Sequence, residues 1–535
     1  MAKIDGASLG YAYHLPSGGC LLRLRNALSQ FSDLFSEFNK YIAPAYHHDR
    51  CERSVQMRLY SMQKGEFVMV FLAFFCCLGL SVFIGLAGPP ITKTSHIKGS
   101  SVLETHNLSL DLMAQGPFPI QSPSITVYRQ QLWVIAVMQT DNSDDEVYEK
   151  PFQVSISIEG ISPGHKKIPV MRSDRYHNRT RHLRCAKQTC EPVTVLHLGY
   201  LYFSRYLFTV HLYGLQSFHK LYHIREINFF FKSYNPGFTQ IEMWFRLIFL
   251  MVTFGVTCWF SLTLRTFFIH DWSIEQRWMS VLLPLLILYN NPIFSLTFLM
   301  DSWVPGMLDA VFQASFLCAL LLFWLCVYHG LRQNERRLLT FYLPKLLIVG
   351  PVWLCAVTMA TWQKYNEHLD PTYSYQLDTS YFYSFKLTFF LFLGLYITYL
   401  LCLILRAYSE LRSMPFFDMR LKFVTLLMLI VLSISMSITV SRFGLGVLED
   451  NFVADLSTNY ASSAQFMACY GLLNFYLYTM AYVYSPSKKT IFETGITKDN
   501  PAFSMINDSD EDVIYGSDEE SRQPLNRNRN DDDSD

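Results

Sequence analysis

The chain has 535 residues and no net formal charge, and only 16% of its residues are charged, against roughly 25% in soluble proteins. Hydrophobic residues make up 51% of the chain and gather in blocks of about 20 residues, the length of helix that crosses a bilayer. A neutral chain has no basic field for nucleic acid. The composition therefore predicts an α-helical polytopic membrane protein, because lipid offers no hydrogen bonds to a backbone that is not helical.

The first apolar block covers Phe67–Ala87 and follows a cytosolic N-terminal extension, residues 1–66. Basic residues just before the block favour a cytosolic N-terminus. Two interpretations are open: an uncleaved anchor, or a signal peptide that is cleaved after Gly85-Leu86-Ala87, with Met57 as a later start. The apolar run is longer than a usual signal core, which favours the anchor.

Residues 88–240 are predicted to form a lumenal or extracellular all-β domain. Phe152–Glu159 alternates between apolar and polar residues, which is the pattern of a strand with one buried face. Several more short runs rich in β-branched or aromatic residues are separated by turn residues, which indicates a small antiparallel sandwich. These runs are Ile125–Tyr128, Leu132–Met138, Val193–Leu198, Leu207–Tyr213 and Ile227–Phe231.

The same segment carries candidate modification sites. Asn107 and Asn178 each begin an Asn-x-Ser/Thr triplet for glycosylation. Cys185 and Cys190 are the only cysteines of the segment, and an oxidising compartment would join them in a disulfide; two free thiols are the alternative. No metal site is predicted, because zinc needs four ligands and the sequence near the cysteines offers too few histidines.

Seven further apolar blocks lie within residues 241–485 and are predicted to form a seven-helix bundle. Each is about 20 residues long, with almost no charge inside it. The predicted spans are Phe245–Leu264, Trp278–Met300, Met307–Gly330, Phe341–Trp362, Tyr383–Leu405, Leu421–Val440 and Gln465–Ser485.

Lysine and arginine are distributed unequally between the alternate short loops, and positive loops stay in the cytosol. One set of loops holds two such residues, Lys364 and Arg442, and the other set holds nine. The nine are Arg265, Arg277, Arg332, Arg336, Arg337, Arg406, Arg412, Arg420 and Lys422. This bias predicts a cytosolic C-terminus and places residues 88–240 on the opposite side of the membrane.

Few polar groups lie inside the predicted spans, and such groups are candidate functional sites because lipid makes them costly. Asn290 and Asn291 precede Pro292, which leaves one backbone carbonyl without its usual donor; Asp309 and Asn474 lie in two other spans. A ligand role competes with simpler interpretations, in which the amides join neighbouring helices and Asp309 faces water. No span carries an acid–base pair, so the chain is not predicted to be an enzyme, and neither catalytic residues nor a cofactor are expected.

Residues 486–535 form a tail with 6 Lys or Arg and 13 Asp or Glu, hence a net charge of −7, and a tail of this kind is predicted to be disordered. Asn500, Pro501 and Phe503 resemble a sorting motif that endocytic adaptors read. Ser509 and Ser517 precede acidic runs that favour phosphorylation. A merely solvated tail is the alternative.

Four strings of the sequence resemble the transmembrane protein 181 family, and the resemblance extends from about Met57 to the end. The strings are Asp271–Leu286, Tyr234–Phe238 with Trp244–Arg246, Phe323–Gly330, and Lys498–Gly516. The resemblance implies a GOLD-domain seven-transmembrane protein, similar in layout to Wntless: a β-sandwich beside a bundle like that of G-protein-coupled receptors. It also implies a large cavity in the bundle, and a family linked to orphan receptors and to the action of bacterial cytolethal distending toxin.

These observations favour a cargo or trafficking receptor of the plasma membrane or the Golgi and endosomal membranes. Its expected partners are membrane lipids, a protein or lipid cargo, the bacterial toxin, and endocytic adaptors at the tail, with no nucleic acid. The first alternative is a signalling receptor, supported by the helix count, although no Asp/Glu-Arg-Tyr ends the third span of the bundle and no Asn-Pro-x-x-Tyr lies in the last span. The second is a lipid or solute transporter.

Overall fold

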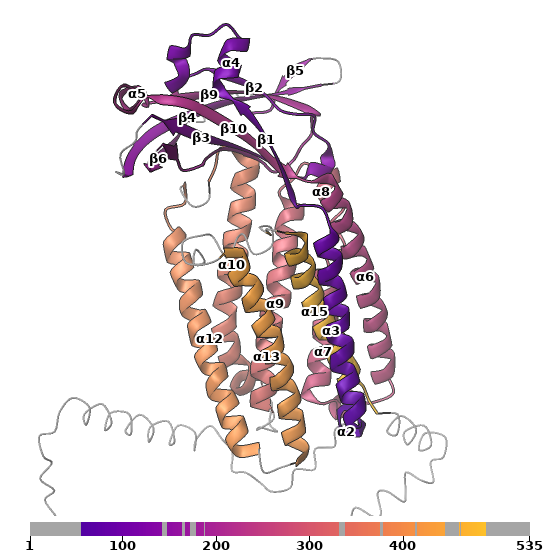
Figure 1. Cartoon of the computed structure of the whole chain (residues 1–535). Coiled ribbons are helices and arrows are strands. Elements are labelled where there is room, and N and C mark those ends of the chain that lie inside the picture. Colours follow the sequence, from indigo (N-terminus) through magenta and orange to yellow (C-terminus); the bar gives the residue numbers. More distant parts are fainter. Residues whose placement is uncertain are drawn as a thin grey trace, which may run out of the picture. The chain divides into compact units, whose positions relative to one another are not determined.

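A computed structural model describes the chain over residues 55–141, 147–162, 166–171, 178–186, 188–330, 338–374, 378–411, 415–443, 460 and 462–487. The predicted sorting motif Asn500, Pro501 and Phe503 lies outside the described residues. So do Ser509 and Ser517, and most of the predicted extension 1–66. Figure 1 labels the helices and strands by which the described parts are named below.

Residues Thr92–Tyr234, here called the strand domain, form a ten-stranded sheet in which all the pairings described are antiparallel. The main order is β1-β10-β3-β7-β6-β4-β9-β2, with β5 paired to β4 and β8 to β3. Two short helices, α4 (Gly99–Thr105) and α5 (Gln216–Tyr222), lie between strands. The strands are β1 (Thr92–Lys98), β2 (Phe118–Gln121), β3 (Leu132–Thr140), β4 (Val147–Ile161), β5 (Lys167–Pro169), β6 (Asn178–Ala186), β7 (Thr189–Cys190), β8 (Val193–Leu198), β9 (Arg205–Tyr213) and β10 (Ile224–Tyr234).

The sheet folds back on itself, because strands that are distant in the pairing order share one hydrophobic core. Phe208 of β9 contacts Phe231 of β10 with ring centroids 6.0 Å apart, and Phe118 of β2 lies 5.3 Å from Phe229. Buried residues alternate with partly exposed ones along β3, as expected for a strand with one face in a core. The predicted sandwich-like all-β domain is confirmed.

One of the predicted strands is wrong. Ile125–Tyr128 contains no strand, and Val127–Arg129 forms a 3-10 turn instead. Gln130, which ends this turn, has a positive φ of 54°, a conformation that interrupts extended backbone. β-branched residues alone do not define a strand when no neighbouring strand is available to pair with them.

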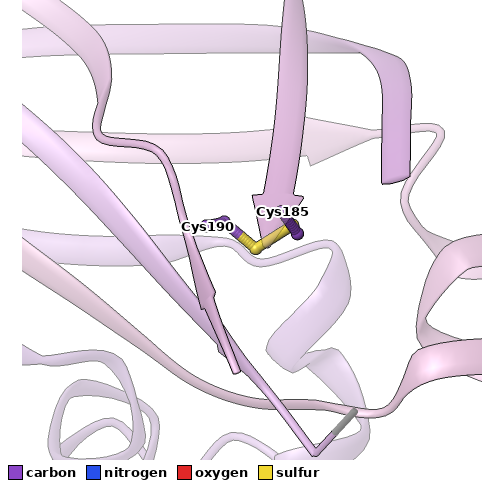
Figure 2. The surroundings of a disulfide bond; sticks show 2 residues. All are labelled: Cys185 and Cys190. Atoms are coloured by element: carbon purple, nitrogen blue, oxygen red, sulfur yellow. A yellow bond between two sulfur atoms is a disulfide. The ribbon is translucent and has the colours of Figure 1, made fainter. Parts of the chain in front are cut away.

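A disulfide joins β6 to β7 (Figure 2), between Cys185 and Cys190. The two residues are direct partners in the antiparallel register, which brings their side chains to the same face of the pair. Both are buried in the core of the strand domain. The bond closes the short hairpin that connects the β6 side of the sheet to β3.

Within the part of the chain that the structure describes, eight helices form the bundle. They are α3 (Lys64–Ala87), α6 (Pro236–Leu264), α7 (Ile274–Tyr289), α9 (Val304–Gly330), α10 (Leu343–Leu369), α12 (Phe382–Leu411), α13 (Pro415–Phe443) and α15 (Ser463–Tyr484). Within the described residues, six helices are long and apolar enough to cross a membrane. These six are Lys64–Ala87, Pro236–Leu264, Val304–Gly330, Leu339–Leu369, Tyr383–Ser409 and Arg420–Ser441, so α7 and α15 fall below this threshold.

The helix α15 packs against α3, α6, α7 and α13 (Figure 1), and most of its side chains are buried. A helix that is covered by protein on several sides does not need a lipid-compatible surface, so its polar residues are tolerated. The predicted span Gln465–Ser485 coincides with this helix, which the structure places at the centre of the bundle.

The predicted span Trp278–Met300 is not one continuous helix. The helix α7 ends at Tyr289, and the chain turns before the short helix α8 (Leu296–Leu299). Asn291 has a positive φ of 52°, and the proline that follows it has no N–H and disfavours helical backbone at the residue before it. The break leaves the two asparagine side chains next to non-helical backbone.

The first span is an integral part of the bundle. A side chain added at Gly85 of α3 would meet the backbone of Ala464 in α15, and one added at Gly471 of α15 would meet Ser81 of α3. Small residues at such positions let membrane helices approach closely. This packing supports the interpretation of Phe67–Ala87 as a retained anchor.

Residues that precede the bundle in the sequence contact residues that follow it, at the C-terminal end of α15. Met57 and Pro486 form an antiparallel bridge, and the Arg58 N–H donates to Ser485 O at 2.8 Å. The first turn of α7 lies beside them, where the Gln276 side chain donates to Tyr484 O at 3.0 Å. The chain therefore enters and leaves the bundle at one place.

An ion pair is buried at the same end of the bundle. Arg420 of α13 donates through Nε and Nη2 to Glu275 of α7, and both side chains are almost fully buried. Arg420 was predicted from the sequence to be one of the basic residues of the short loops. The structure corrects this, because the residue lies inside α13 and faces a neighbouring helix.

Candidate functional site

Three charged residues meet inside the bundle and are here called the charged cluster: Glu242, Arg246 and Asp309. In α6, Arg246 donates to Glu242 Oε1 through Nε at 3.1 Å and through Nη2 at 3.0 Å. Arg246 Nη1 lies 3.5 Å from Asp309 Oδ1 in α9. The guanidinium also stacks over the ring of Phe294, 4.4 Å from its centroid.

The start of α6 positions this cluster. Asn235 caps the helix by accepting from the Gly237 N–H at 3.1 Å, and Pro236 occupies its first turn, where a missing N–H costs nothing. The helix therefore begins well before Phe245, where the sequence prediction started the span. Glu242 and Arg246 lie on this extra helical segment, four residues apart and on one face.

Asp309 receives its closest hydrogen bonds from neutral groups. Asn291 Nδ2 donates to Oδ1 at 2.7 Å, and Gln313 Nε2 donates to Oδ2 at 2.9 Å. The carboxylate is 18% exposed. The structure thus brings together two predicted residues, Asn291 and Asp309, in contact with an arginine that the sequence analysis did not select.

The other two predicted residues form a neutral network deeper in the bundle. Asn290 Nδ2 donates to Asn474 Oδ1 at 3.0 Å and to Thr253 Oγ1 at 2.8 Å. Asn474 Nδ2 donates in turn to Tyr470 O at 2.9 Å. These bonds connect α6, α7 and α15, and Asn290 and Asn474 are fully buried. They fit the interpretation in which amides join helices.

Two arginines connect the strand domain to the loop after α10, and are here called the arginine pair: Arg179 and Arg181. Arg179 Nη2 donates to Asp370 Oδ2 at 2.6 Å. Arg181 Nη2 donates to Thr372 O at 2.6 Å, and its guanidinium lies 3.2 Å and 3.3 Å from the two oxygens of Asp378. The pair holds β6 against the bundle.

Burial and hydrogen bonding shift the pKa of Asp370 in opposite directions. Partial burial by itself raises the pKa of Asp370, but hydrogen bonds from Thr372 and Arg179 outweigh it and hold that pKa below its usual range. Burial opposes the charge of Arg179, whose pKa is nevertheless raised because Asp370 and Asp378 face it. The ion pair between Arg179 and Asp370 is therefore charged at physiological pH.

A second set of contacts crosses between the same two parts. The His197 N–H donates to Pro371 O at 2.8 Å, and His197 Nδ1 lies 3.7 Å from Glu367 Oε1. The imidazole stacks on Trp133 with an interplanar angle of 2°. Glu367 is also paired with Lys364 at 3.3 Å.

Two cavities lie where the strand domain meets the bundle. The large cavity has a volume of about 660 Å³ and is walled by both parts, among others by Gly199, Tyr202, Trp303 and His368. The small cavity has a volume of about 80 Å³ and is lined by the charged cluster, Lys364 and several aromatic rings. The two cavities share the lining residues Gln131, Thr297, Gly306 and Lys364.

The other predicted site residues lie on the surface of the strand domain. Asn107 and Asn178 are both exposed, so a glycan on either would project into solvent. Within the described residues, no group of three or more His, Cys, Asp or Glu side chains could hold a metal ion. The site that the structure presents consists of cavities lined by aromatic and charged side chains.

The sequence analysis missed Glu242, Arg246 and the arginine pair. The spacing of Glu242 and Arg246 is a signal that could have found them, since an acid and a base four residues apart at the edge of an apolar block form an ion pair within one helix. The arginine pair carries no such signal. Arg181 and Asp378 are 197 residues apart.

The fold and the site define a class: a multi-pass helical membrane protein whose β-rich domain sits against a bundle with a buried polar network. Two family models match in succession, a TMEM181 GOLD domain over residues 116–234 and a Wntless-like transmembrane domain over residues 235–488. The human protein Transmembrane protein 181 is 51% identical over 466 residues, which are 87% of this chain and 94% of that protein. The chain belongs to the transmembrane protein 181 family, as its sequence strings indicated.

Proposed function

We propose that the protein is a cargo or trafficking receptor of the secretory and endocytic pathway, which binds its ligand in the large cavity. The cavity of about 660 Å³ between two folded parts is the observation that supports this proposal. Ligand sites of this volume occur preferentially at domain interfaces and are lined by aromatic residues with a few polar groups. A ligand that contacts both walls of the large cavity would bind the strand domain and the bundle at the same time, so its binding could change how the two parts pack.

The proposed topology places the strand domain and its cavity on the lumenal or extracellular side and the C-terminus in the cytosol. The uneven distribution of basic loops supports this orientation. The cargo, a protein or a lipid, would then meet the cavity on one side of the membrane, while adaptors read Asn500–Phe503 on the other. A role in the action of bacterial cytolethal distending toxin follows from the family resemblance alone.

The test compares surface and endosomal proteomes of cells that lack the chain and are complemented with variants. Gly199→Trp fills the large cavity, and the added Cβ has open space around it. The matched control is Gly394→Trp, at an exposed position of α12 that also has open space. Clients that mislocalise without the chain should be restored by the wild type and the control but not by Gly199→Trp. Full restoration by Gly199→Trp would refute the proposal.

A signalling receptor is the second candidate, and the buried Glu275–Arg420 pair favours it. The pair joins α7 to α13, and release of such a contact would let these helices separate at that end of the bundle. Recruitment of a G protein by the purified chain, enhanced by Glu275→Gln, would favour signalling over sorting. No recruitment by either protein would leave sorting as the sole proposal.

A further inference from the structure

We infer that the ligand presents a protonated amine, which enters the small cavity and binds beside Asp309. This inference rests on the proposed function, because the rest of the ligand would occupy the large cavity. It adds the chemical class of the group that is recognised.

The lining of the two cavities is negative. It contains four carboxylates, on Glu242, Asp301, Asp309 and Glu367, and two permanent cations, on Arg246 and Lys364. The formal net charge of these six side chains is −2. Negative charge in a partly buried site favours a cationic ligand, because the low dielectric strengthens the attraction.

Asp309 is the carboxylate of the charged cluster that is more weakly paired with Arg246. Arg246 is engaged by Glu242 at 3.0 Å and 3.1 Å, whereas its distance to Asp309 is 3.5 Å. The two closest donors to Asp309 are the neutral amides of Asn291 and Gln313. The charged cluster has two carboxylates and one guanidinium, so one negative charge is not compensated within it. Such a charge is unfavourable in a buried site, and an ammonium group beside Asp309 would supply the missing positive charge.

The aromatic walls suit the same group. Phe238, Phe294, Tyr460 and Phe466 line the small cavity, and the ring of Phe294 already carries one cation, the Arg246 guanidinium. Aromatic faces attract cations through the ring quadrupole. An amine attached to a short apolar stem would therefore find both a counter-charge and ring faces.

Size determines how the ligand is divided between the cavities. A volume of about 80 Å³ holds several water molecules, which is room for an ammonium head and a few methylene groups but not for a whole ligand. The large cavity, at about 660 Å³, would take the remainder. Since the cavities share Gly306 and Lys364 among their lining residues, one ligand can extend through both.

Lys364 is the group that would oppose a cation, but its charge is compensated. Its Nζ lies 3.3 Å from Glu367 Oε2. The alternative is that Arg246 and Lys364 already balance the two carboxylates of the small cavity. Such a site would not distinguish an amine from a neutral molecule of the same shape, and the experiment separates these cases.

The experiment measures the thermal unfolding of the purified full chain in lipid nanodiscs with three probes of similar shape. These are phenethylamine, the neutral 2-phenylethanol and the anion 3-phenylpropionate. The amine alone should raise the unfolding temperature, and the rise should saturate with concentration. Equal stabilisation by the neutral or the anionic probe, or none by the amine, would overturn the inference.

Variants identify the site. Asp309→Asn should weaken amine binding by about tenfold or more, as expected for the loss of a charged hydrogen bond, whereas Asp271→Asn at the other end of the bundle should not. Ala310→Leu reduces the small cavity without changing charge and should also abolish amine binding, which keeps the test valid if Asp309→Asn does not fold. Unchanged binding in both cavity variants would refute the site.

This outcome is distinguishable from the proposed function. If the amine does not bind while Gly199→Trp still blocks client sorting, the ligand chemistry is wrong and the receptor function stands. If the amine binds at Asp309 but no client protein is mislocalised in cells that lack the chain, the site stands and the sorting function is wrong.

Discussion

Replacing Arg181 by alanine should open the contact between the strand domain and the loop after α10. The guanidinium is buried, with an exposed fraction of 4%, and contacts both oxygens of Asp378 and the carbonyl of Thr372. Breaking a buried pair costs about 3 to 5 kcal/mol. Asp378 keeps a hydrogen bond from the Ser374 N–H at 2.7 Å and is 13% exposed, so we expect about 2 to 4 kcal/mol here.

Hydrogen exchange of the full chain in nanodiscs measures this quantity. The amides of Thr372 and Ser374 donate to side chains that the arginine pair holds in place, so they exchange when the contact opens. A loss of about 2 to 4 kcal/mol in the free energy of opening this contact corresponds to a rise in the exchange rate of these amides of roughly 30- to 1,000-fold. The measurement is local, and amides in the core of the strand domain should change little.

Arg184→Ala is the matched control. Arg184 lies on the same strand, and its ion pair with Glu191 is exposed, with a distance of 3.7 Å. Exposed ion pairs contribute about 0 to 1 kcal/mol, so the loop amides should exchange at the wild-type rate. Equal exchange in the Arg181 and Arg184 variants would show that the arginine pair does not hold the loop, and the reasoning would be wrong.

Three further predictions concern other contacts. The pKa of Asp370 is lowered in the folded protein, so the contribution of this carboxylate to stability is complete above its ordinary pKa of 3.8 and is lost as the pH falls through the lower folded pKa. Hydrogen-exchange protection of the loop after α10, corrected for intrinsic rates, should therefore be the same at pH 7.4 and pH 5. A decline between those pH values would contradict this. Glu275→Gln should lower the free energy of unfolding by about 3 to 5 kcal/mol because it removes the carboxylate that faces the buried Arg420, and adding Arg420→Met should restore most of it. Denaturant unfolding in detergent tests this, and a double variant that is no more stable than the single one would contradict it. Gly85→Leu should destabilise the bundle by about 1 to 3 kcal/mol because the new side chain meets the backbone of α15, whereas Gly79→Leu, which has open space, should not; equal thermal unfolding of these two variants would argue against close packing of α3.

Local sequence patterns predicted the elements of the fold well. Apolar blocks of bilayer length predicted the helices, since any such block must satisfy its backbone internally. Period-two alternation predicted β4 around Phe152–Glu159, and Val193–Leu198 coincides with β8. The predicted span Trp278–Met300 failed for a local reason, because Asn291 and Pro292 break the helix. Gln465–Ser485 coincides with α15, and burial among other helices lets α15 be more polar than a lipid-facing helix.

The sequence by itself determined that this is a multi-pass membrane protein with a β-rich domain, because hydrophobic length and alternation are properties of neighbouring residues. It also selected Asn291 and Asp309 as unusual in lipid. Only the tertiary structure decided that Asn291 and Asp309 contact each other beside Arg246, and that the arginine pair holds β6 to the loop after α10. It alone also decided that two cavities lie between the strand domain and the bundle. Such contacts join side chains that are far apart in the chain, 63 residues for Arg246 and Asp309, and periodicity carries no information about which distant side chains will meet.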